Sequence, residues 1–319
     1  MDNSSISSAP AVSIVVPCYN EQAVIEQTAA ILLDRISALS EKKKISPDSK
    51  LYFVDDGSTD GSWLMIEGLA KNDTRLSGIK LSRNRGHQNA LLAGLSVAEG
   101  DALISIDADL QDDVNAIEEM VDHFRDGYDV VYGVRRRRAT DAVYKRVSAK
   151  TFYRLIEYLG AESVYNHADF RLMSRRAVEA LKGFQEVNLF LRGLVPLVGF
   201  RFTIVQYDRG ERLAGRTKYS PGRMFALALD AITSFSVLPL RIISLIGGLV
   251  FLFASVMSLW VLWIKAFTNQ AIPGWASTVL PIYFLGGIQL LCTGVVGEYL
   301  GKTYAEVKRR PRYIIEKIV

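Results

Sequence analysis

The sequence predicts an α/β domain with a mostly parallel sheet, followed by two membrane-spanning helices. Two observations lead to this prediction. Over residues 12–209, short apolar runs alternate with helical patterns, which is typical of repeated βα units. Beyond residue 241 the chain contains two long uncharged stretches, and core helices rarely stay uncharged around their whole circumference. The composition, with 49% hydrophobic and 23% charged residues, excludes a disordered or collagen-like chain.

The predicted strands of the first half end beside polar residues. We expect strands at residues 12–17, 51–54, 79–81 and 102–106, with helices at 21–39, 63–70 and 87–98 between them. Asp55 and Asp56 follow the second strand, and Asp107 and Asp109 follow the fourth. Ligands of open α/β sheets bind beyond the carboxyl ends of the strands, so this edge is the predicted site. Neither a GxGxxG nor a GxxxxGK[ST] motif is present, so a dinucleotide fold and a P-loop NTPase are not supported.

The two uncharged stretches cover residues 242–264 and about 278–297. At 1.5 Å per residue they reach about 34 Å and roughly 30 Å, enough to cross a hydrocarbon core of about 30 Å. Basic residues precede the first stretch and follow the second, which predicts a multi-pass protein of the inner membrane with both termini in the cytoplasm. A pair of buried core helices is the alternative.

The expected organisation therefore has three parts. Residues 1–220 form a cytoplasmic catalytic domain, residues 221–240 an interfacial amphipathic helix, and residues 241–319 the two spans with a basic cytoplasmic tail. An ordinary core helix is the alternative for the middle part. Cys18 and Cys292 are too few for a disulfide framework, and no disulfide is expected.

Asp107 and Asp109 form an Asp-x-Asp pattern directly after an apolar strand. Neighbouring carboxylates repel each other, and a divalent cation shared with a diphosphate would offset that cost. Hard oxygen ligands suit Mg²⁺ or Mn²⁺. The pattern alone is weak evidence, because an acid at a helix N-terminus is the more common explanation. Gln111 and Asp112 close behind it, together with the acidic pair after another strand, favour the metal interpretation.

Three motifs, in this order, resemble family 2 glycosyltransferases of the GT-A fold. They are VVPCYNE at 15–21, VDDGSTDG at 54–61 and DADLQD at 107–112. Later segments resemble the polyprenyl-phosphate sugar transferases, in particular the bactoprenol glucosyltransferases: ADFRLM at 168–173, RGER at 209–212 and GEYLG at 297–301. The similarity covers nearly the whole chain.

This resemblance implies roles for individual residues. The uridine of a UDP-sugar would be held by Pro17, Tyr19, Glu21 and Asp56, and Asp107 would meet its ribose or diphosphate. Asp109 and Gln111 would ligate the Mg²⁺ or Mn²⁺, and the catalytic residues would be Asp109 and Asp169. For Asp169 both a general base and a positioning role stay open.

The acceptor implied by the resemblance is a lipid phosphate. The second pKa of such a phosphate is about 6, so the attacking oxygen is already anionic near neutral pH and needs no base. Two anionic groups then have to be held by cations. The favoured cations are Arg135, Arg146, Arg212 and Lys218. His87 opens a helix and either touches the donor diphosphate or serves as a structural cap.

The expected reaction is inverting transfer of a hexose, with glucose as the first candidate, from a UDP-sugar to undecaprenyl phosphate at the cytoplasmic membrane face. The product would be a lipid-linked donor for surface glycan modification, handed on to a flippase and a second glycosyltransferase. A homo-oligomer is left open. The net charge of +4 is too weak for a nucleic-acid binder, and the basic cluster flanks the predicted membrane anchor.

Three alternatives remain. The same reaction with another sugar, of the GlcNAc, mannose or aminoarabinose type, fits the same motifs. A processive polysaccharide synthase fits only the front domain, and the Gln-x-x-Arg-Trp motif of those enzymes is absent. An inactive membrane adaptor would not need its intact aspartates, Asp107, Asp109 and Asp169.

Overall fold

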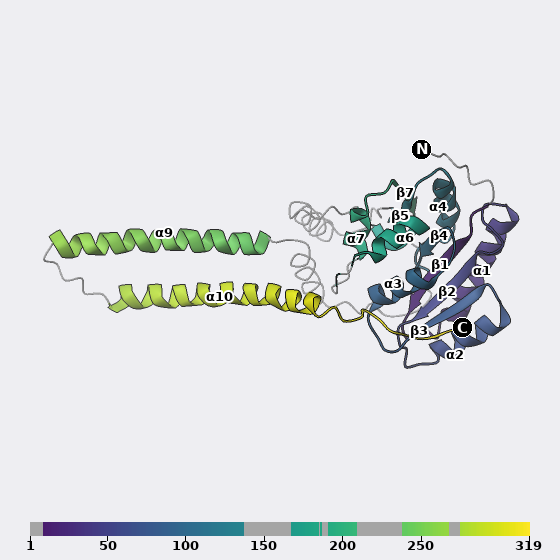
Figure 1. Ribbon diagram of the computed structural model, residues 1–319, viewed down its shortest axis with the longest axis horizontal. Helices are drawn as coiled ribbons and strands as arrows, with labels where there is room; N and C mark the ends of the chain where they lie inside the picture. Colours follow the sequence, from purple (N-terminus) through teal and green to yellow (C-terminus); the bar gives the residue numbers. More distant parts are fainter. Residues whose placement is uncertain (1–8, 137–166, 185, 187–190, 209–237, 268–274) are drawn as a thin grey trace. The chain divides into compact units, whose positions relative to one another are not determined.

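The structure is a computed structural model that describes residues 9–136, 167–184, 186, 191–208, 238–267 and 275–319 (Figure 1). The described chain forms two compact units. One contains the described residues up to Asp208 together with residues 309–319. The other contains two long helices, α9 and α10.

The first half of the larger unit alternates strands and helices, as the sequence predicts. Its elements are β1 (Val12–Cys18), α1 (Ile25–Glu41), β2 (Lys50–Asp55), α2 (Ser62–Asn72), β3 (Leu76–Leu81), α3 (His87–Val97) and β4 (Ala102–Ser105). Each predicted strand and helix of this region is confirmed, with ends shifted by a few residues. All seven residues of β1 are buried, because the strand has neighbours on both sides and helices above it.

The second half adds a mixed set of elements. These are α4 (Ala116–Arg125), β5 (Val130–Arg135), β6 (His167–Ser174), α6 (Arg175–Lys182), α7 (Leu191–Leu197), β7 (Phe202–Tyr207) and β8 (Ile315–Ile318). The α6 helix begins after Ser174, whose hydroxyl accepts a hydrogen bond from the backbone N–H of Ala177 at 3.2 Å.

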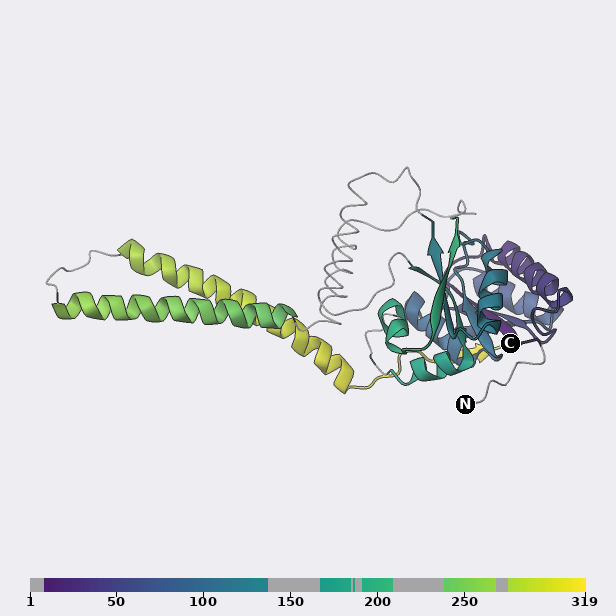
Figure 2. The same ribbon diagram turned by 90° about the horizontal axis from the view of Figure 1, so that it is seen from above.

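The strands form one sheet of eight in the order β7-β5-β6-β4-β1-β2-β3-β8 (Figures 1 and 2). Neighbours are parallel in the run β4-β1-β2-β3 and in the pair β5-β7. Strand β6 is antiparallel to both of its neighbours, β4 and β5. The expectation of an α/β fold with a mostly parallel sheet is therefore confirmed.

Strand β8 was not expected from the sequence, which grouped residues 309–319 with the membrane helices. It pairs antiparallel with β3 and covers that edge of the sheet. Lys80 of β3 makes an ion pair with Glu316 of β8 at 2.8 Å, and Lys317 of β8 makes one with Glu67 of α2 at 2.5 Å. The end of the described chain is thus part of the larger unit rather than a separate basic tail.

The smaller unit contains α9 (Leu238–Phe267) and α10 (Trp275–Val307). The predicted helices at 242–264 and 278–297 are confirmed as helices. Among the described residues, however, none of the helices has both the length and the apolar character that crossing a bilayer requires, so the structure does not support the expected spans. The predicted interfacial helix at 221–240 lies outside the described residues except for its last three positions.

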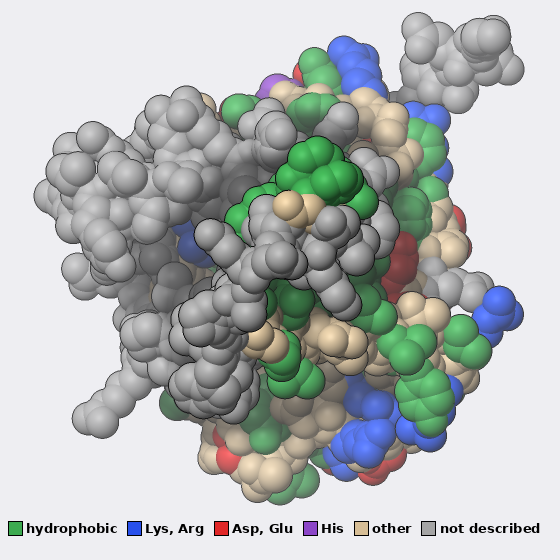
Figure 3. All heavy atoms as spheres, turned by 90° about the vertical axis from the view of Figure 1, so that its left-hand side faces the viewer, with side chains coloured by type: hydrophobic (Ala, Val, Ile, Leu, Met, Phe, Trp, Pro, Cys, Tyr) green, Lys and Arg blue, Asp and Glu red, His purple; other side chains and the backbone are tan. Residues whose placement is uncertain are grey.

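Many apolar side chains on these two helices are exposed. On α9 they include Leu249, Leu252, Phe253, Trp260 and Trp263, and on α10 Ile282, Leu290, Leu300 and Val307. Apolar side chains, drawn in green, also reach the surface in the view of Figure 3. Apolar exposure along both helices is typical of a surface that contacts lipid or another protein.

Helix α3 approaches the sheet closely because of Gly94. A Cβ atom at this position would lie 2.4 Å from a methyl carbon of Val15 and 2.5 Å from one of Val54. We predict that Gly94→Ala lowers the free energy of unfolding by about 1–3 kcal/mol through overpacking.

Gly68 of α2 is the matched control, since no described atom would lie within 4 Å of a Cβ added there. Gly68→Ala should raise the stability by about 0.4–1 kcal/mol. Thermal unfolding of the purified protein checks both variants. Equal midpoints for Gly94→Ala and Gly68→Ala would contradict the packing argument.

Candidate active site

The candidate site lies where β1, β2 and β4 end side by side. The three strands are parallel neighbours, and Cys18 at the end of β1 pairs with Asp55 at the end of β2. The loops that follow them therefore start from the same edge of the sheet. This topology brings together segments 17–21, 55–58 and 107–112, which lie far apart in the sequence.

Two segments of the predicted donor site, at residues 19–21 and 58–62, are joined by hydrogen bonds. The side-chain oxygen of Asn20 accepts a hydrogen bond from the backbone N–H of Thr59 at 2.8 Å. In the same way, the backbone N–H of Glu21 donates to the hydroxyl of Ser62 at 3.0 Å. Tyr19, which lies between the end of β1 and these two hydrogen-bonded residues, is 39% exposed, and Pro17 is buried in β1. The loop is thus held in one conformation with the tyrosine accessible to a ligand.

Asp56 fastens a third loop to the first two. Its carboxylate accepts hydrogen bonds from the backbone N–H groups of Arg85 at 2.7 Å and Gly86 at 2.8 Å. The chain at Gly57 passes so close that an added Cβ would lie 2.7 Å from the carbonyl carbon of Arg83. Burial raises the pKa of Asp56, and the two N–H donors oppose that rise.

Asp107, Asp109 and Gln111 occupy a tight turn after β4. Leu110 has a φ of +44°, and the backbone N–H of Gln111 points to a carboxylate oxygen of Asp109 at 3.4 Å. Burial raises the pKa of Asp107, and the nearby carboxylates of Asp169, Asp112 and Asp109 raise it further. Within the described part of the chain, no three His, Cys, Asp or Glu side chains gather as a metal cluster.

Asp112, at the end of this turn, binds the side chains of Arg135 and Tyr207, a contact that sequence reasoning missed. One of its oxygens accepts hydrogen bonds from Nε and Nη2 of Arg135, at 3.0 and 2.8 Å, and from the hydroxyl of Tyr207 at 2.6 Å. Burial and the negative charge of Asp112 raise the pKa of Tyr207 well above its usual range. Arg135, predicted to contact the acceptor phosphate, is thus held by Asp112.

The antiparallel strand β6 brings Asp169 to the same edge. Ser105, the last residue of β4, pairs with Arg171 of β6, and its hydroxyl donates to the carbonyl of Asp169, so Asp169 lies near the edge from which the acidic turn starts. His87, at the start of α3, faces both carboxylates. Its Nε2 lies 3.4 Å from an oxygen of Asp107 and 3.7 Å from an oxygen of Asp169. In the described chain no side-chain hydrogen bond caps α3, so the structure does not support the expected alternative of a structural cap for His87.

Asp169 is 6% exposed and is surrounded by hydrogen-bond donors. Arg171 Nη2 contacts Oδ1 at 2.8 Å, and Arg192 contacts both oxygens, at 3.2 and 3.1 Å. The amide of Gln88 reaches Oδ2 at 3.3 Å. Burial by itself would raise the pKa of Asp169, but the charges of Arg171 and Arg192 hold it well below its usual range.

The structure therefore unites most of the predicted residues and adds several. Arg146, Arg212 and Lys218 lie outside the described residues. The residues that sequence reasoning missed are Gln88, Arg171, Arg192 and Tyr207; Asp112 was counted toward the metal pattern, but its contacts with Arg135 and Tyr207 were not expected. Only Arg171 left a usable signal, since its spacing of two from Asp169 in a strand places both side chains on one face.

The model of the family described as "Glycosyl transferase family 2" matches residues 13–182, which hold all three front motifs. This chain belongs to glycosyltransferase family 2. As a member it is a transferase enzyme with a GT-A-like α/β fold, and the resemblance inferred from its motifs is confirmed.

Relatives of the family 2 chain match over nearly its full length. An uncharacterized glycosyltransferase, YkoT, of Bacillus subtilis is 47% identical and covers 97% of this chain and 92% of its own. The "Prophage bactoprenol glucosyl transferase homolog" of Escherichia coli is 40% identical, covering 96% and 99%. The "SfII prophage-derived bactoprenol glucosyl transferase" of Shigella flexneri is 38% identical, covering 96% and 97%.

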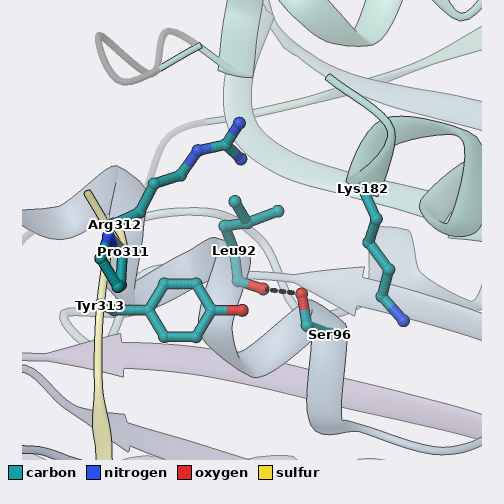
Figure 4. Close-up of a pocket in the computed structure, with 6 residues that line it drawn as sticks. All are labelled: Leu92, Ser96, Lys182, Pro311, Arg312 and Tyr313. Carbon is teal, nitrogen blue, oxygen red and sulfur yellow. Dashed lines mark hydrogen bonds between the residues drawn. The ribbon is translucent and has the colours of Figure 1, made fainter. Parts of the chain in front are cut away.

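A separate hollow of about 430 Å³ lies between α3, α6 and the segment before β8 (Figure 4). It is lined by Leu92, Ser96, Lys182, Pro311, Arg312 and Tyr313. None of the predicted site residues lines it, and Ser96 there donates its hydroxyl to the carbonyl of Leu92 at 2.7 Å. This hollow is therefore distinct from the acidic edge of the sheet.

The surroundings of Asp169 predict a pH-dependent contribution to stability. Asp169→Asn leaves the buried Arg171 beside a neutral partner, which should cost about 3 kcal/mol near neutral pH. Because the pKa of Asp169 is lowered in the folded chain, the wild-type advantage is full above about pH 4 and fades as the pH falls further.

Thermal unfolding of the wild type and of Asp169→Asn between pH 3 and pH 8 measures this difference. The exposed Asp126 provides the control, since Asp126→Asn should change the midpoint little at any pH. A gap between the wild type and Asp169→Asn that widens on acidification would contradict the argument.

Proposed function

We propose that this family 2 glycosyltransferase transfers a hexose, with glucose as the first candidate, from a UDP-sugar to a polyprenyl phosphate with inversion. The observation that carries the proposal is the full-length similarity to proteins named bactoprenol glucosyl transferase, at about 40% identity over 96% of this chain. The arrangement of loops and carboxylates at the sheet edge supports it.

The donor side of the proposal rests on the fastened loops. The exposed ring of Tyr19 offers a stacking surface, and Asp56 lies under the same edge, held by two backbone N–H groups. Together with Pro17 and Glu21 these are the proposed uridine contacts. Asp107, on the turn that follows β4, would face the ribose or the diphosphate. Rigid loops around an open edge suit a nucleotide, because little ordering is needed on binding.

The residues present fit a divalent cation. Asp109 and Gln111 offer hard oxygen ligands on one tight turn, and Oδ1 of Asp107 is buried without a hydrogen-bond partner among the described residues. A Mg²⁺ ion is usually held by one or two carboxylates with substrate phosphates supplying the rest, which suits a site without a large protein cluster. When bound, the cation would stabilise the charge of the leaving diphosphate.

The acceptor side needs no general base. A phosphate monoester oxygen attacks the anomeric carbon, the bond to the diphosphate breaks, and UDP leaves with the electron pair. Near neutral pH that oxygen is already an anion. The protein's task is to hold both anionic groups in line, which is why cations matter. Arg135, with Arg146, Arg212 and Lys218, remains a predicted acceptor contact, and Asp112 sets its orientation.

A polyprenyl acceptor stays in the bilayer, so the enzyme has to work at a lipid surface. The exposed apolar side chains of α9 and α10 support such membrane association. The cytoplasmic side, and a flippase and second transferase that use the product, belong to the same proposal.

The reaction itself can be tested directly. The purified protein is incubated with polyprenyl phosphate, Mg²⁺ or Mn²⁺, and one of several sugar nucleotides, including UDP-glucose and UDP-GlcNAc. We expect UDP release and a lipid product heavier by one hexose, seen by mass spectrometry, and no UDP release without the lipid. Release of UDP that is independent of the lipid, or a long glycan product, would contradict the proposal.

The metal role gives a second prediction. Asp109→Asn replaces a charged ligand by a neutral amide, so turnover should fall by at least about a hundredfold at saturating substrates. The apparent metal concentration for half-maximal rate should rise in the same variant. The nearby Asp113→Asn is the control, because the Asp113 carboxylate accepts hydrogen bonds from Asn115, both at 2.9 Å, just before α4. Full activity of Asp109→Asn in the presence of a chelator would exclude the metal role.

A further inference from the structure

The carboxylate of Asp169 has its hydrogen-bonding capacity filled by protein groups. An ionised carboxylate offers about four acceptor sites. In this structure four donors point to it: Arg171 Nη2, Arg192 Nε, Arg192 Nη2 and the amide of Gln88, at 2.8, 3.2, 3.1 and 3.3 Å. A general base at this position would have to give up one of these donors before it could accept a proton. The site is therefore poorly suited to base catalysis.

The two arginines around Asp169 are not equivalent. The side chain of Arg171 is 1% exposed and balances the buried carboxylate charge. The side chain of Arg192 is 41% exposed, so its guanidinium stands at the surface of the site. Nε and Nη2 of Arg192 both donate hydrogen bonds to the carboxylate of Asp169, which fixes the plane of the guanidinium.

The backbone that carries Arg192 is fixed as well. The N–H of Leu191, the first residue of α7, donates to the side-chain oxygen of Gln88 at 3.1 Å. The carbonyl of the same residue accepts from Arg171 Nη1 at 3.4 Å. Both groups that hold Leu191 also hold Asp169, so backbone and guanidinium are oriented by one network. Such a preorganised cation is what stabilisation of transferred charge requires.

We propose that Arg192 is a catalytic residue that contacts a phosphate group of the substrates, and that Asp169 is a positioning residue acting through it. This inference rests on the proposed function, in which both the donor diphosphate and the acceptor phosphate are anionic. The planar guanidinium matches phosphate oxygens in two-point contacts. The imidazole of His87 lies close to both Asp107, which is proposed to face the donor, and Asp169. Arg192, which contacts Asp169, therefore belongs to the same site.

The test compares Arg192→Ala, Arg192→Lys and a matched control. Arg176 is the control, because it also makes a two-point contact, at 2.5 Å, with a buried aspartate, Asp129, but belongs to none of the site loops. Steady-state kinetics are measured with the UDP-sugar and the lipid phosphate varied in turn. We expect Arg192→Ala to lower kcat/KM by tenfold or more, with Arg192→Lys in between and Arg176→Ala unchanged.

A rise in KM for one of the two substrates identifies the phosphate that Arg192 contacts, either that of the donor or that of the acceptor. Kinetics of Arg192→Ala equal to those of Arg176→Ala would overturn the inference. The pH profile provides an independent arm. Removing the charge of Arg192 should raise the pKa of Asp169, so a base role predicts that the rate of Arg192→Ala gains an acidic limb that the wild type lacks, whereas a positioning role predicts profiles of the same shape for both proteins.

A double variant tests the coupling. If Asp169 acts through Arg192, Asp169→Asn combined with Arg192→Ala should be no slower than Arg192→Ala alone, within about twofold. Losses that multiply would overturn the positioning role. Should Asp169→Asn not fold, Gln88→Ala takes its place in the cycle, since it removes one donor and no charge. Absence of any transfer by the wild type would instead count against the proposed function.

Discussion

Negative charge gathered at one edge of the sheet is the constraint on which the rest of this site depends. Carboxylates at the ends of neighbouring strands repel one another, and burial makes that repulsion more costly. The protein compensates each one differently. Backbone N–H groups hold Asp56, the guanidinium of Arg135 and the hydroxyl of Tyr207 hold Asp112, and two arginines hold Asp169. Within the described chain, Oδ1 of Asp107 has no hydrogen-bond partner, and Nε2 of His87 lies 3.4 Å from it.

This distribution separates the carboxylates by chemical character. Asp169, inside a ring of donors, has a pKa held well below its usual range and stays ionised. Burial, and after it the neighbouring carboxylates, raise the pKa of Asp107, so this side chain gains from a cation. A carboxylate whose negative charge is already balanced by arginines of the protein is suited to positioning other groups. A carboxylate whose charge is not balanced in this way is suited to binding a metal ion or another cation of the substrate complex.

The same elements that build the sheet also build the electrostatics. Strand β6 runs antiparallel between β4 and β5, and that direction alone places Asp169 opposite the end of β4. Helix α3 starts from the loop that Asp56 holds, so its first two residues, His87 and Gln88, reach the carboxylates. The loop at 17–21, the acidic turn at 107–112 and the two arginines, Arg171 and Arg192, are therefore parts of one connected structure.

The sequence by itself determined the α/β class, the first four strands, the acidic turn and the family. These follow from local patterns: apolar periodicity fixes each strand, and the spacing within motifs such as 107–112 fixes which oxygens share a turn. Uncharged runs likewise predicted the two long helices, although apolar side chains alone do not determine what surrounds them. Only the tertiary structure decided which residues meet across the chain. Arg192 and Gln88 contact Asp169 from more than 20 residues away, and Tyr207 reaches Asp112 from 95 residues away. Strand β8 joins β3 from the other end of the sequence. No local pattern specifies such pairs, because strand order and direction arise when the whole sheet packs. The charge partners of each carboxylate, and with them its chemistry, are set at that stage.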